Sequence, residues 1–153
     1  MSRNAPARRP AAERPGPRPS QRDYEALSEF RYLIRCFLEF SQNEAKRVGL
    51  TPRQHQALLA IKGFAAGRSI TVGDLAERLR IRHHSAVELV DRLAEAGLVE
   101  RTVDPADHRR ALLSLTARAE EDLADLSAAH LDELSRIEPV LERILGRNRR
   151  REG

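Results

Sequence analysis

Apolar residues between Ser69 and Thr116 recur first at helical spacing and then at strand spacing. One short helix is predicted to begin at Thr71, and a second to begin near His83 and stop at Gly97. Only residues 80–82 separate them, which suits a helix-turn-helix connection. The buried positions expected in the two helices are Leu75, Ala76 and Leu79, then Ala86, Leu89, Val90 and Leu93.

A two-stranded hairpin is predicted directly after the second helix. Residues 98–102 and 111–115 have strand-like composition, and Asp104-Pro105 between them favours a turn. A helix-turn-helix followed by such a wing is the layout of a winged-helix DNA-binding domain. The predicted fold class is therefore mainly α with a small β-wing.

Three further helical patterns flank or precede this region, at about residues 23–48, 52–64 and 117–145. Leu58, Leu59 and Ile61 are expected to be buried in the middle pattern, with His55 as a core histidine, and Pro139 predicts a kink or break in the last. Neither terminal helix has an obvious partner in so small a core, so pairing of two copies, a homodimer, would bury their apolar stripes. These stripes are Leu27, Phe30, Ile34, Phe37, Leu38 and Ala45, and Leu123, Leu126, Leu131, Leu134, Ile137, Leu141, Ile144 and Leu145.

The candidate DNA contacts lie on the second short helix and on the wing. A recognition helix uses its N-terminal residues on base edges, and Arg109 at the wing tip is placed to enter the minor groove, with Asp107 as a forked partner for its guanidinium. Thr71, which caps the first short helix, completes the set. The candidates are Arg82, His83, His84, Ser85, Val87, Glu88, Arg92, Asp107, Arg109, Arg110 and Thr71.

The region resembles the MarR family of bacterial transcription regulators. The resemblance covers roughly residues 23–146 and implies an obligate homodimer that binds a pseudo-palindromic operator, most often as a repressor, and that is frequently released by a small aromatic effector. Two positions depart from the family pattern, because Arg82 stands where Ser or Thr is common and Glu88 where basic or small polar residues are usual. The matching segments are Leu50-Thr51-Pro52, residues 75–79, 89–93 and 97–101, Asp104 to Arg109, and Leu113 to Thr116 with Asp107, Arg109, Leu115 and Thr116 as the wing signature.

The length of 153 residues suits one MarR-like domain, predicted over residues 21–146 with its winged helix at about 50–116. Residues 1–20 contain five Arg against one Glu, and so account for the whole net charge of +4. They are Pro- and Arg-rich without periodicity, so we expect a disordered basic tail that either stays solvated or contacts phosphates. Residues 147–153 form a second basic tail.

Several other classes of function find little support. No apolar run is long enough for a membrane span, so a cytoplasmic protein is expected, and no plausible catalytic constellation or cofactor motif indicates an enzyme. A zinc site built from His83, His84 and His108 lacks a fourth ligand.

Two alternatives remain open. Cys36 beside Arg35 resembles the reactive cysteine of the hydroperoxide-sensing branch of the family, although Phe40 one turn later lacks a hydroxyl. Residues 80–110 carry six Arg against six acidic residues, so the module could instead dock a protein. The arginines of the wing favour DNA, rather than a protein, as the partner of this module.

Overall fold

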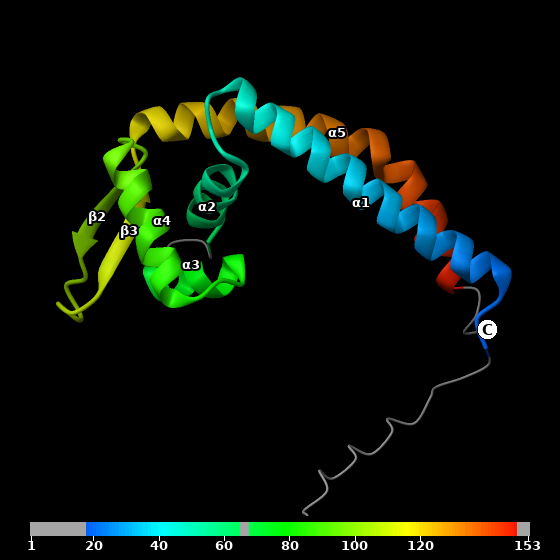
Figure 1. The fold of residues 1–153 in the computed structure, drawn as a ribbon, viewed down its shortest axis with the longest axis horizontal. Helices are drawn as coiled ribbons and strands as arrows, with labels where there is room; N and C mark the ends of the chain where they lie inside the picture. The colour runs from blue at the N-terminus through cyan, green and yellow to red at the C-terminus, as the bar shows by residue number, and fades with distance from the viewer. Residues whose placement is uncertain (1–17, 65–67, 150–153) are drawn as a thin grey trace, which may run out of the picture.

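The computed structural model describes residues 18–64 and 68–149, and it has two parts, a winged-helix head and a pair of long helical arms (Figure 1). The elements are α1 (Gln21–Arg47), α2 (Pro52–Lys62), β1 (Ile70–Thr71), α3 (Val72–Leu79), α4 (His83–Glu95), β2 (Val99–Val103), β3 (Ala111–Leu115) and α5 (Ala117–Arg149). The mainly helical fold with a small β-wing is therefore confirmed.

The head packs α2, α3 and α4 against a three-stranded antiparallel sheet of order β1-β3-β2. Val99 pairs with Leu115 and Val103 with Ala111, which is the predicted hairpin moved by one residue in its first strand. β1 was not predicted, because a two-residue strand leaves no alternation to read; its Ile70 pairs with Leu113 and is 1% exposed. Among the described residues, the largest fully buried side chains are Leu58, Ile70, Leu75, Leu93, Leu126 and Val90.

A capping box fixes where α2 begins. The Thr51 hydroxyl accepts a hydrogen bond from the Gln54 backbone N–H at 3.1 Å, and the Gln54 side-chain oxygen accepts one from Thr51 N–H at 2.9 Å. Pro52 occupies the first turn, where its missing N–H costs no hydrogen bond. This pair of hydrogen bonds is a capping box, and it fixes the start of α2 a few residues after the end of α1.

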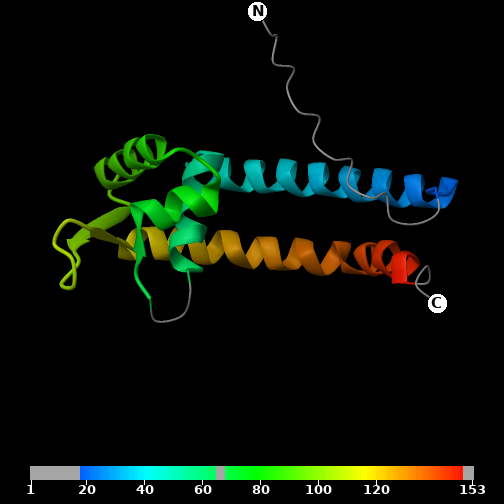
Figure 2. The ribbon, with the colours of Figure 1, turned by 90° about the horizontal axis from the view of Figure 1, so that it is seen from below.

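The arms α1 and α5 lie side by side in one protomer, as both ribbon views show (Figure 1 and Figure 2). An Arg143 nitrogen is 2.8 Å from a Glu29 oxygen near their free ends. The prediction that neither terminal helix has a partner within the protomer was therefore wrong. It failed because periodicity shows that a helix has an apolar face but not what covers it.

Three packing expectations need correction. Leu59 is 48% exposed, whereas Leu58 and Ile61 are buried as predicted. Leu126 belongs to the core of its own protomer at 0% exposure, rather than to a stripe left open for a second copy. The α5 helix also continues through Pro139, so of the predicted kink or break the break is wrong, and the kink stays a prediction. His55, at 3% exposure, is confirmed as a core residue.

The expected tails fall mostly outside this description. Residues 1–17 and 150–153 lie outside the described residues, and the backbone of α5 runs on to Arg149, into the segment assigned to the C-terminal tail. Within the described helices, none combines the length and apolarity needed to cross a membrane.

Candidate nucleic-acid interface

A left-handed residue makes the turn between α3 and α4. Arg80 has φ 54° and ψ 42°, and the next N–H, that of Ile81, donates to the Ala76 carbonyl at 3.0 Å. This bond satisfies a carbonyl at the end of α3 and redirects the chain. The α4 helix can therefore begin three residues later, at His83, and lie across α3.

The α3 helix begins with a capping box that occupies the Thr71 side chain. The Thr71 hydroxyl donates to Asp74 Oδ2 at 2.7 Å and accepts from the Asp74 backbone N–H at 3.2 Å. Asp74 Oδ2 also accepts from the Thr71 backbone N–H, and these bonds lower the pKa of the Asp74 carboxyl, first through the backbone bond and then through the hydroxyl. Thr71 is 8% exposed, so the structure gives it a capping role, and its contact with DNA stays a prediction.

The α4 helix buries one face in the head and exposes the other. Ala86, Leu89, Val90 and Leu93 are buried, as their spacing predicted. Among the candidates, Ser85 is half-buried and Val87 is 36% exposed. The remaining candidates on this helix and at its cap are exposed: Arg82, His83, His84, Glu88 and Arg92.

None of these five exposed side chains has a hydrogen-bond or ion-pair partner among the described residues, and Arg82 and Glu88 carry the charges that matter most for base contacts. Arg82 is the N-cap of α4 with extended backbone, but its side chain makes no capping hydrogen bond. No ion pair or side-chain hydrogen bond within the described part of the chain involves Glu88. Both side chains are thus free to bond to a ligand at the start of the helix.

Two aspartates shape the tip of the wing. Asp104 Oδ1 accepts from the Ala106 N–H at 2.9 Å, and Asp107 Oδ1 accepts from the Arg109 N–H at 3.1 Å. The Arg109 side chain is 95% exposed, with its Nε 3.5 Å from Asp107 Oδ1. The predicted pairing is present, but it joins one nitrogen to one oxygen and is not forked. Most of the guanidinium therefore projects from the tip without a partner.

An ion pair that the sequence analysis missed joins α4 to the wing. The Arg101 guanidinium on β2 contacts Asp91 Oδ1 on α4, ten residues earlier in the chain. Asp91 lies one turn after Val87, on the exposed side of the helix. Opposite charges at positions 91 and 101 were visible in the sequence, but their contact depends on how the wing packs on the helix.

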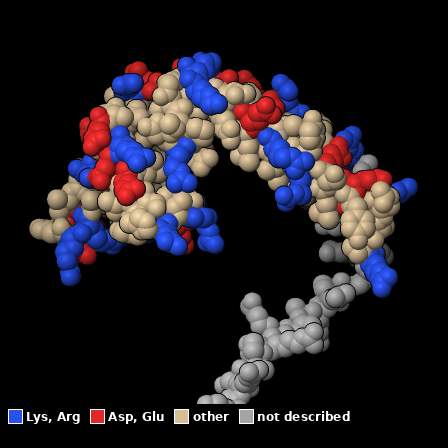
Figure 3. Space-filling model, in the orientation of Figure 1, with Lys and Arg blue, Asp and Glu red and all other residues tan. Residues whose placement is uncertain are grey.

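Basic side chains gather along one edge of the head. In Figure 3, Lys and Arg predominate at its lower edge, around the wing tip and below α3, whereas Asp and Glu are more frequent higher on the same face. Acidic and basic side chains are thus partly separated in space on this face of the head. An edge of this kind favours a polyanion.

Comparisons with known proteins agree with this geometry. The MarR family model matches residues 48–110, which span α2 to the end of the wing loop. An HTH-type transcriptional regulator of Bacillus subtilis, YcgE, is 31% identical over 107 residues, covering 70% of this chain and 68% of YcgE. The chain belongs to the MarR family.

MarR family structures also share the whole fold. A MarR family protein from Bacillus stearothermophilus superimposes with a TM-score of 0.69 at 20% identity, covering 88% of this chain and 99% of that one. AbsC from Streptomyces coelicolor gives 0.64 at 17% identity, over 86% and 99%. A MepR variant from S. aureus, solved bound to an oligodeoxyribonucleotide, gives 0.61 at 20% identity, over 76% and 82%. The match to the family model and the similarity to YcgE, rather than these structures, identify the chain as a DNA-binding transcriptional regulator.

The remaining candidate, Cys36, is half-buried on α1. The pKa of the Tyr32 phenol one turn earlier is raised, chiefly by a hydrogen bond with the Cys36 thiol and then by the charge of the thiolate. The hydroxyl of Tyr32 thus lies on the other side of the cysteine from position 40, where a hydroxyl was expected. A redox role for Cys36 stays a prediction.

Within the described residues, no group of three or more His, Cys, Asp or Glu side chains is placed to hold a metal ion. The structure therefore gathers no ligand set around His83, His84 and His108.

Proposed function

We propose that this MarR family regulator is a repressor that binds a pseudo-palindromic operator as a homodimer. The observation that carries the proposal is the exposure, on one head, of both the start of α4 and the Arg109 side chain. A helix fits the major groove and an arginine fits the adjacent narrow minor groove. Each head would therefore cover one half-site.

The exposed residues at the start of α4 suit specific base contacts. Arg82 is placed to bond guanine through O6 and N7, and Glu88 to accept from the N4 amine of cytosine. A carboxylate beside phosphates is unfavourable unless it has such a donor, because repulsion from the backbone would otherwise oppose binding. His83, His84, Ser85, Val87 and Arg92 complete the proposed reading surface, with Asp107, Arg110 and Thr71 at the wing and at the start of α3.

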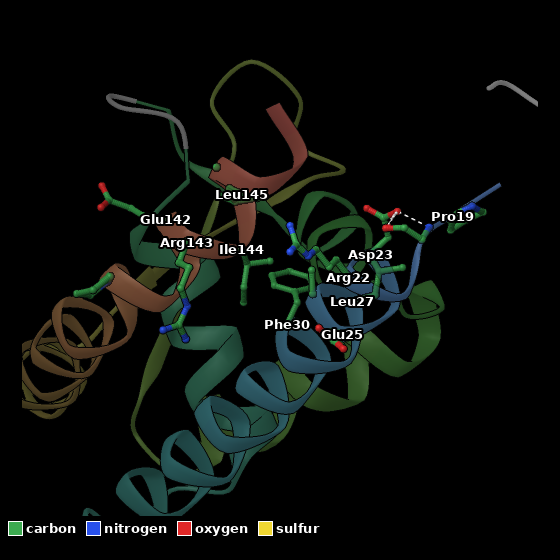
Figure 4. A pocket seen from close by; sticks show the side chains of 14 residues that line it. Pro19, Arg22, Asp23, Glu25, Leu27, Phe30, Glu142, Arg143, Ile144 and Leu145 are labelled. Atoms are coloured by element: carbon green, nitrogen blue, oxygen red, sulfur yellow. Dashed lines mark hydrogen bonds between the residues drawn. The ribbon is translucent and has the colours of Figure 1, made fainter. Parts of the chain in front are cut away.

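The arms provide the surface for a second copy. Exposed apolar side chains follow one another along both helices, and such a patch is much larger than the isolated apolar residues normal on a monomer. Near the free ends the patch is hollowed into a groove of about 1120 Å³, where Leu27, Phe30 and Ile144 point toward one another from the two helices (Figure 4). The exposed apolar residues are Tyr24, Leu27, Phe30, Tyr32, Ile34, Leu38, Leu131, Leu134 and Leu145.

The proposed pairing follows from the shape of the arms. Two copies related by a two-fold axis would bury these arms against each other and leave both heads free. Two heads held at a fixed separation match a palindromic site. Release of the DNA by a small aromatic effector belongs to the proposal through the family alone, and we assign it no binding residues.

The experiment is footprinting of the DNA upstream of the regulator's own gene, combined with light scattering of the free protein. We expect a dimer and two protected half-sites whose centres are about one helical turn apart, roughly 34–36 Å. Transcription from that promoter in vitro should fall as the regulator is added. A monomer, or protection no stronger than on scrambled DNA, would reject the proposal and favour a role in protein docking.

A further inference from the structure

A cluster of aromatic rings joins the head to the arms, around His130 of α5. The His130 ring lies 5.8 Å from Phe37 and 5.4 Å from Phe40 of α1, both edge-on, and 4.9 Å from the His55 ring of α2. The three helices therefore meet at one imidazole. The α2 helix belongs to the head, and α1 and α5 are the arms. This contact therefore helps to set the orientation of the head relative to the arms.

Both nitrogens of His130 have partners. Nδ1 is 2.6 Å from the Leu126 carbonyl oxygen, which only accepts, so Nδ1 carries a hydrogen and donates it. Nε2 is 2.8 Å from the Ser41 hydroxyl of α1. In neutral His130 this nitrogen accepts from Ser41, and in the cation it donates to the same oxygen. Ser41 thus satisfies His130 in either protonation state.

His55 is in the opposite situation. Its residue is 3% exposed, and no described side chain forms a hydrogen bond with its ring. Burial lowers the pKa of His55, and the neighbouring His130 lowers it further. A proton added to His55 would therefore sit at a buried residue beside a second imidazole, which is unfavourable.

The surrounding charges do not offset the unfavourable energy of a proton on His55. Glu44 of α1 is paired with Arg47 at 3.0 Å, and Glu133 of α5 with Arg136 at 3.2 Å. Only burial and His130 contribute to the shift of the His55 pKa. Other titratable or charged residues on neighbouring turns of α1, α2 and α5 include Arg35, Cys36, Glu39, Lys46, Arg53, Lys62, Asp122, Asp125 and Asp132. The α3 helix, which packs on α2, adds Asp74, Glu77 and Arg78, and β3 adds none.

We propose that the His55–His130 contact is a proton-sensitive joint, neutral when closed, whose opening in mild acid releases the head from the arms and weakens operator binding. The proposal rests on the proposed function, because the loss of affinity requires two heads held at a fixed spacing. Protonation of His55 is disfavoured while it is buried against His130, so protons favour the state in which α2 has moved away.

The direction of the pH effect follows from linkage. The His55 pKa is lowered in the folded state from its ordinary value of 6.5. The stabilisation of the closed joint is complete above that value, and it is lost as pH falls from there through the folded-state pKa. Exposed His83 and His84 act in the opposite direction on DNA binding, because their protonation adds positive charge beside phosphate.

The first test needs no DNA. NMR titration of the full chain follows the His55 ring signals together with backbone signals of α1, α2 and α5 from about pH 7.5 to 5.5. We expect His55 to titrate below its ordinary value, and the signals of the three helices to shift with it. Titration of His55 at its ordinary value, or without change in the three helices, would overturn the proposal whatever the DNA results.

The second test compares operator affinity over the same pH range in the wild type, His55→Phe and His108→Gln. Phe keeps a ring at position 55 but cannot take a proton, and His108 is an exposed histidine of the wing outside the proposed contacts. Acid should weaken the wild type relative to His55→Phe by up to about tenfold per pH unit for each protomer, the limit for one proton. His108→Gln should keep the wild-type slope.

A third variant covers a folding failure of His55→Phe. His130→Gln retains a polar side chain near Ser41 but removes the second imidazole, so the His55 pKa should move toward its ordinary value. The difference in the His55 pKa between the closed and open states then becomes smaller, and the loss of affinity in acid should be smaller than in the wild type. Equal slopes in the wild type and in whichever of these two variants folds would overturn the joint. Absence of operator binding at every pH would instead reject the proposed function, and the NMR titration would still decide the joint.

Discussion

The Asp91 carboxylate on α4 is paired with the Arg101 guanidinium on β2, so side chains as well as backbone connect the recognition helix to the wing. In the proposed interface α4 and the wing enter different grooves, so their relative position would determine whether both fit at once. An exposed pair of this kind contributes little to stability, typically about 0.2–1 kcal/mol. Its importance is expected in the alignment of the interface.

Breaking this pair should affect DNA binding more than folding. Arg101→Gln should lower the free energy of unfolding by less than about 1 kcal/mol, measured in urea. Operator affinity should fall further than that, because the wing is no longer held at its angle to α4. Asp91→Asn serves as the matched variant, and the double variant should be no worse than either single one. Additive losses in affinity would show that the two residues act separately.

The exposed wing arginine should supply affinity without much choice of sequence. Arg109→Ala should weaken binding to all duplexes and reduce the slope of log affinity against log salt by about one unit. Arg136→Ala on α5 removes another exposed charge, at 78% exposure against 95% for Arg109, and should leave the slope unchanged. Titrations at several salt concentrations give both slopes. An unchanged slope for Arg109→Ala would remove the wing from the interface.

Substitutions of two leucines of α5 should distinguish an effect on folding from an effect on dimer formation. Leu126 is fully buried in the protomer, so Leu126→Ala should cost about 2–5 kcal/mol of stability. Leu131 is 63% exposed on the same helix, so Leu131→Asp should leave the protomer folded but convert dimers to monomers. Circular dichroism and light scattering distinguish the two results. A Leu131→Asp protein that remains dimeric would place the interface elsewhere.

The turn between α3 and α4 should be improved by glycine. Arg80 adopts the left-handed conformation, which costs a non-glycine residue roughly 1–2 kcal/mol. Arg80→Gly should therefore raise the free energy of unfolding by up to about 1 kcal/mol, the strain relief being partly offset by the greater freedom of the unfolded chain. Arg82→Gly, at an extended position two residues later, should bring no such gain. Urea unfolding of both variants measures the difference.

The head was more predictable from sequence than the arms. The periodic apolar residues of α3 and α4 and the turn residues of the wing are local signals, and they gave the order of elements and most of the buried positions. The contacts of α5 were not predictable in this way. Leu126 and Leu131 look alike in the pattern, yet one is in the core and the other is exposed.

In the candidate site, too, local features were predictable from sequence and contacts between elements were not. Exposure of Arg82, His84 and Glu88 followed from the helical period, whereas the Asp91–Arg101 pair and the capping role of Thr71 depend on packing between elements. The meeting of His55 with His130, 75 residues later in the chain, had no local signal at all. Side chains that act across elements thus required the structure.

The central claim is that the start of α4 reads bases, and selection of bound sequences from a random DNA pool tests it most directly. The proteins to compare are the wild type, Glu88→Ala and His84→Ala. A good base contact is worth about 1–3 kcal/mol of discrimination. Glu88→Ala should therefore relax the preference at one position in each half-site, without loss of non-specific affinity, and His84→Ala should lower specific binding more than non-specific binding. Identical base preferences in all three proteins would contradict the account.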